Sequence, residues 1–65
     1  MYQIQLIEQT NPQPEIVKSG LQNMRAAKIY LNAIKEAWAL DGLPMHYTGQ
    51  SLIIEGAATY TIIPQ

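Results

Sequence analysis

Hydrophobic and polar side chains alternate along residues 2–8, where Tyr2, Ile4 and Leu6 are separated by glutamines. Successive side chains of a β-strand point to opposite faces, so this period of two predicts a half-buried strand over residues 2–8. Ile7 is the one hydrophobic residue that falls on the polar face.

Two prolines follow this segment, at Pro12 and Pro14. Because proline has no backbone N–H to donate, the sequence predicts a loop over residues 9–18. Within it, residues 15–18 fit either a helical turn that starts after Pro14 or an extended chain. We favour the extended chain, because two of these four residues are β-branched.

The next segment is rich in Ala, Leu, Met, Lys, Gln and Glu and contains no proline, which predicts a helix over residues 20–40. Ser19 and Gln22 have the spacing of a capping box, in which each side chain bonds to the backbone of the other residue. Asp41 and Gly42 form the stop signal, with the glycine in the left-handed conformation that ends many helices.

The last third of the chain is rich in β-branched and aromatic residues and predicts strands over residues 44–48, 51–55 and 58–63. The first two form a hairpin around Gly49 and Gln50, where glycine in the first position suits a type II′ turn. A second tight turn, which contains a glycine, separates the last two strands.

These elements predict one domain over residues 1–65, of the α+β class. Its order is β-α-β-β-β, with a single helix packed on one face of a mostly antiparallel sheet. The alternation of residues predicts which strand side chains face the helix: Tyr2, Ile4, Leu6, Met45, Tyr47, Leu52, Ile54, Ala58, Tyr60 and Ile62.

The predicted helix is more hydrophobic than a sheet of four strands requires. At 100° per residue its apolar side chains cover an arc of about 220°, whereas a helix that lies on a sheet needs about 100°. The small side of this arc, suited to close approach to the strands, comprises Ala26, Ala33 and Ala37. The bulky side comprises Met24, Leu31, Ile34 and Trp38. We expect one of the two sides to contact a subunit or partner; the alternative is that the long loop covers the surplus.

The candidate partner-binding residues are therefore Met24, Leu31, Ile34 and Trp38, together with the basic residues Arg25, Lys28 and Lys35 on the polar face. Trp38 has two interpretations, because tryptophan is common both at interface hot spots and as the anchor of a small core. We favour the core. The basic residues are typical of a solvated helix face, and a nucleic-acid contact is the alternative.

Size and charge narrow the functional classes. A chain of 65 residues buries only about 60% of the surface that its unfolded form exposes, and without cysteine it has no disulfide to stabilise it. Its charged fraction of 14% is low, and uncharged surface tends to find a partner. A net charge of −1 does not favour binding to nucleic acid or anionic lipid. With no long apolar run and no leader pattern, we expect a cytoplasmic, soluble protein and no membrane partner.

No catalytic, cofactor-binding or metal-binding constellation is present in the sequence. His46 is the only histidine, and it forms no known metal-ligand spacing with Asp41, Glu36 or Glu55. Neither Ser19 nor Ser51 lies in a nucleophile motif. We therefore expect a protein that is not an enzyme and has no cofactor.

The succession of a strand at 2–8, an Ala-rich helix at 20–40, a hairpin at 45–55 and a last strand resembles the small accessory proteins of phages and mobile elements, including anti-CRISPR inhibitors. The resemblance implies a non-enzymatic inhibitor or adaptor that occupies a surface of a larger host complex. Many such inhibitors are acidic mimics of nucleic acid, and a net charge of −1 departs from that pattern.

The sequence thus predicts a small protein-binding module whose partner is another protein or a second copy of itself, in a homodimer formed through a helix or an edge strand. Two alternatives remain open: a nucleic-acid-associated regulator that uses Arg25, Lys28 and Lys35, and a purely self-associating structural dimer.

Overall fold

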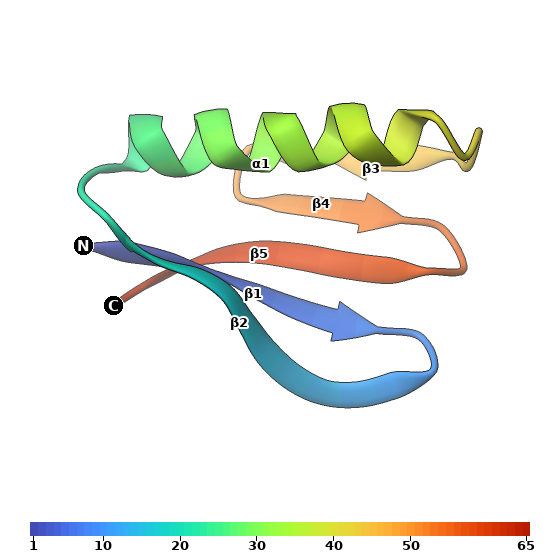
Figure 1. Cartoon of the computed structure of the whole chain (residues 1–65), viewed down its shortest axis with the longest axis horizontal. Helices are drawn as coiled ribbons and strands as arrows, with labels where there is room; N and C mark the ends of the chain where they lie inside the picture. Colours follow the sequence, from blue (N-terminus) through green and yellow to red (C-terminus); the bar gives the residue numbers. More distant parts are fainter.

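A computed structural model describes all 65 residues and shows one helix packed against a five-stranded antiparallel sheet (Figure 1). The predicted α+β class is confirmed, with one strand more than the sequence predicted. The elements in chain order are β1 (Tyr2–Glu8), β2 (Asn11–Leu21), α1 (Met24–Ala39), β3 (Met45–Tyr47), β4 (Ser51–Ile54) and β5 (Ala58–Pro64). The strand order across the sheet is β2-β1-β5-β4-β3.

The extra strand, β2, covers most of the segment for which the sequence predicted a loop, so the loop over residues 9–18 is wrong. β2 lies at the edge of the sheet and pairs only with β1. An edge strand needs backbone donors on one side only, which is why it accommodates Pro12 and Pro14. Three register shifts let its 11 residues pair with the seven of β1. The preference for an extended chain at residues 15–18 is confirmed.

The helix begins later than predicted, at Met24 instead of residue 20. Its N-cap is Asn23, whose side-chain oxygen accepts a hydrogen bond of 2.8 Å from the backbone N–H of Ala26. Ser19 lies in β2 and caps nothing, because pairing with β1 continues as far as Leu21. The C-terminal end of the helix lies closer to its predicted position: α1 ends at Ala39, and Gly42 takes the left-handed conformation.

The strands after the helix lie within about one residue of their predicted ranges. Between β3 and β4, the backbone N–H of Thr48 donates to the carbonyl of Ser51 at 3.0 Å, which closes a two-residue turn. Gly49 has a φ of 95° and Gln50 has no positive φ, the pattern of a type II′ turn.

The core lies between α1 and the sheet. It consists of Ile4, Ala27, Leu31, Leu52, Ile54 and Ile62. Four of the predicted helix-facing residues belong to this cluster, and Tyr2, Met45 and Tyr60 pack against it. Tyr47 differs: it is 46% exposed, because it ends the short edge strand β3. Beside the core, the indole N–H of Trp38 donates to the hydroxyl of Tyr60 at 3.0 Å.

Candidate protein-binding surfaces

The face of the sheet opposite α1 is covered by no other element of the chain (Figure 1). The strand register places Ile7, Thr59 and Ile53 side by side in one row across β1, β5 and β4. The next row contains Gln5, Thr61 and Ser51. The two rows are uncharged, so a partner could cover them without removing an ion from water.

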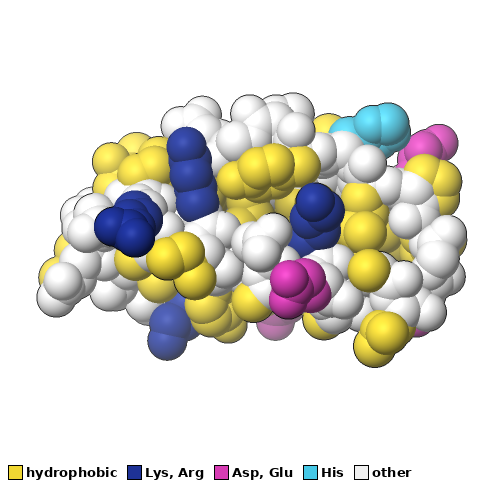
Figure 2. Space-filling view, turned by 90° about the horizontal axis from the view of Figure 1, so that it is seen from above, with side chains coloured by type: hydrophobic (Ala, Val, Ile, Leu, Met, Phe, Trp, Pro, Cys, Tyr) yellow, Lys and Arg dark blue, Asp and Glu magenta, His cyan; other side chains and the backbone are white.

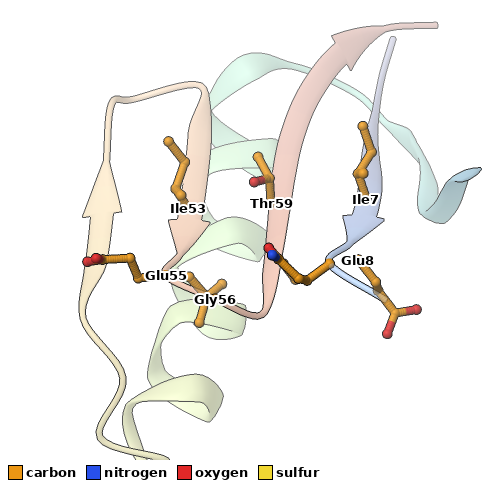
Figure 3. A pocket seen from close by; sticks show the side chains of 9 residues that line it. Ile7, Glu8, Ile53, Glu55, Gly56 and Thr59 are labelled. Atoms are coloured by element: carbon orange, nitrogen blue, oxygen red, sulfur yellow. The ribbon is translucent and has the colours of Figure 1, made fainter. Parts of the chain in front are cut away.

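The first of these rows forms part of a shallow hollow of about 220 Å³ (Figure 3). The hollow lies towards the end of the sheet that carries the β1–β2 and β4–β5 turns, away from the two chain ends (Figure 1). Its lining consists of Ile7, Glu8, Gln9, Ile53, Ile54, Glu55, Gly56, Ala58 and Thr59.

Two carboxylates stand at the margins of the hollow. The side chains of Glu8 and Glu55 extend in different directions from its two sides (Figure 3). The carboxylate of Glu55 points to His46, with 3.4 Å between Oε2 of Glu55 and Nε2 of the imidazole ring. Both side chains are exposed to water. The hollow therefore combines two isoleucine side chains, Ile7 and Ile53, with negative charge at its rim, an arrangement for binding an apolar side chain with basic neighbours.

Ser51, one of the two serines of the chain, has a hydrogen-bonding partner within the sheet. The hydroxyl of Ser51 lies 3.3 Å from that of Thr61 in the neighbouring strand. No group of three or more His, Cys, Asp or Glu side chains is placed to hold a metal ion.

The bulky side of the helix, for which we predicted a partner contact, faces the protein's own sheet. Leu31 has no exposed surface and cannot contact a partner. Met24, Ile34 and Trp38 are partly buried against the core, as we favoured for the tryptophan. Long side chains are needed here because they must fill the space between the helix and the sheet.

The small side of the helix, which we expected against the strands, is mostly exposed instead. Ala33 and Ala37 face water, together with Ile29 and Leu40. A signal for this orientation was present in the sequence: positions 24, 27, 31, 34 and 38 alternate by three and four and form a complete core-facing stripe by themselves.

The basic candidates Arg25, Lys28 and Lys35 are all exposed on α1. Seen from above the helix, lysine and arginine side chains are separated by hydrophobic ones and do not form a continuous basic patch (Figure 2). A fourth cation, Lys18 of β2, lies 5.8 Å from the ring centre of Tyr30.

Comparison with known proteins finds no matching family model, no matching curated protein and no matching solved structure. The one helix, α1, does not combine the length and the hydrophobicity that a membrane-spanning helix requires.

Proposed function

We propose that this protein is a small non-enzymatic binding module that acts by occupying a surface of a larger protein complex, as a phage-type inhibitor or adaptor does. The surface it uses is the open sheet face. The observation that carries the proposal is the row formed by Ile7, Thr59 and Ile53, whose hollow the chain itself leaves uncovered.

The physical case rests on rigidity and on the absence of charge. The row spans three hydrogen-bonded strands, so little conformational entropy is lost when a partner binds to it. Ile7 and Ile53 are each 38% exposed, and their burial by a partner is favourable. The rim carboxylates of Glu8 and Glu55 favour a partner segment with an apolar side chain next to lysine or arginine.

Site-specific photo-crosslinking tests this proposal. A crosslinking amino acid at Thr59, in the row, is compared with one at Lys28, on the exposed helix surface, in lysate of the source cells. We expect one discrete adduct from position 59, lost when Ile53→Lys is added, and no such adduct from position 28. Equal adducts from both positions, or an adduct that survives Ile53→Lys, would contradict the use of this face.

Nucleic-acid binding is the second candidate, and the exposure of Arg25, Lys28 and Lys35 favours it. Three cations neutralise few phosphates, so this binding would be weak, and the slope of log affinity against log salt would be only about −3. Fluorescence anisotropy with labelled duplex at low salt measures it. If the double variant Arg25→Glu, Lys28→Glu bound the duplex with the same affinity as wild type, nucleic-acid binding through these residues would be excluded.

A further inference from the structure

The flank of α1 that faces away from the sheet carries a stripe of five hydrophobic side chains, of which four are exposed and one, Ala26, is half-buried. We call Ala26, Ile29, Ala33, Ala37 and Leu40 the outer stripe. Leu40 is 90% exposed and Ile29 63%, well above the 38% of Ile7 and Ile53 on the sheet face. We propose that a second copy of this chain covers the outer stripe, in an antiparallel homodimer of two α1 helices.

The sizes of the side chains along the stripe fit a two-fold axis at Ala33. Ile29 and Ala37 lie four residues before and after Ala33, so an antiparallel pair sets each Ile29 against the partner's Ala37. Ala26 and Leu40 lie seven residues before and after it, so each Leu40 meets the partner's Ala26. Every large side chain thus faces a small one, and an alanine at the crossing point allows the close axial approach at which helices pack well.

Charge supports the same arrangement. At 100° per residue, Arg25 and Glu36 lie on the same flank of the outer stripe, about 80° and 60° from the direction of Ala33. Neither forms an ion pair within the chain. The two-fold axis places the partner's Glu36 on the same side of the interface as Arg25 and about 7.5 Å from it along the helix, within reach of the long arginine side chain, so the pair occurs twice.

The edges of the sheet are less suited to a second copy. β2 lacks two backbone donors, at Pro12 and Pro14, and has three register shifts. β3, the other edge, is only three residues long. The chain is also below the size at which a single core is comfortably stable, and the helix interface adds buried apolar surface. The dimer uses neither sheet face, so it is independent of the proposed partner contact.

Disulfide trapping tests the geometry directly, because the wild-type chain contains no cysteine. Under mild oxidation, Ala33→Cys should form a covalent dimer on a non-reducing gel. Ala39→Cys is the matched control, since it is also an exposed alanine of α1 but lies off the stripe. A mixture of Ile29→Cys and Ala37→Cys chains should form the mixed dimer in preference to either self-dimer. Preferred self-dimers of Ile29→Cys would overturn the antiparallel orientation.

Mass in solution supplies the second test, by light scattering after size exclusion at two concentrations that differ tenfold. Wild type should approach twice 7.3 kDa at the higher concentration. Ala33→Glu should remain a monomer, because it places two carboxylates at the axis, whereas Ala39→Glu should dimerise like wild type. Circular dichroism checks that both variants are folded. A monomeric wild type at both concentrations, or equal dimerisation of the two variants, would refute the proposal.

The charge contact is tested by a swap. Arg25→Glu and Glu36→Arg should each raise the dissociation constant of the dimer by about fivefold, and the double variant should restore it. Two single variants that weaken the dimer without recovery in the double variant would show that these residues do not meet across the axis.

Discussion

Replacement of Leu31 by alanine should destabilise the protein severely. The side chain has no exposed surface and belongs to the core cluster between α1 and the sheet. A buried Leu→Ala change costs about 2–5 kcal/mol, from lost transfer energy and the cavity that remains. At about 0.05–0.15 kcal/mol per residue, the whole domain has a free energy of unfolding of about 3–10 kcal/mol. The variant should therefore lose about a fifth of its stability or more, and its thermal midpoint should fall by at least about 8 °C.

Ile29→Ala is the matched control, since it also shortens a large aliphatic side chain of α1, but at a position that is 63% exposed. Its free energy of unfolding should stay within about 0.5 kcal/mol of wild type. The assay is urea denaturation followed by far-ultraviolet circular dichroism, at a protein concentration low enough that self-association adds no stability. If Leu31→Ala proved as mild as Ile29→Ala, Leu31 would not be a core residue and its assignment to a partner surface would have to be restored.

Three further substitutions test local features. Tyr60→Phe should cost about 1 kcal/mol, because it leaves the partly buried indole N–H of Trp38 without its acceptor, and denaturation followed by the fluorescence of this single tryptophan measures it. Asn23→Ala should cost about 1 kcal/mol and Ser19→Ala much less, since only the first residue caps the helix; the opposite ranking in urea denaturation would restore the capping box. Gly49→Ala should lower the thermal midpoint by several degrees, because the turn requires a positive φ; an unchanged midpoint would show that the turn tolerates a side chain.

The sequence predicted well those features of the fold that depend on residues close to one another in the chain. The helix composition, the stop at Gly42 and the turn at Gly49 depend on residues close in sequence, and the structure places these features close to where the sequence does. β2 could not be predicted in this way. Its prolines are compatible with a strand only because that strand lies at an edge, and strand order is decided by long-range pairing.

The same distinction between local and long-range determinants applies to the candidate surfaces. The alternation of residues correctly separated the helix-facing side of the sheet from the open side, because the period of a strand fixes which residues share a face. On α1 the hydrophobic arc was too wide to indicate which part faces inward. That choice follows from volume: Leu31 and Trp38 fill the space above the sheet, whereas Ala33 and Ala37 would leave it empty.

The position of the first strand inside the sheet, next to the last one, has a consequence for biosynthesis. β1 pairs with β5 along its whole length, from Tyr2 with Pro64 to Glu8 with Ala58. The β1–β2 hairpin can form early because its contacts are local, but the sheet that supports α1 is complete only when β5 is present. Folding on the ribosome therefore has to wait until the residues of β5 have left the exit tunnel, and until then α1 has only part of the surface that it later covers. A chain interrupted before residue 58 would present Leu31 and Trp38 to chaperones and proteases.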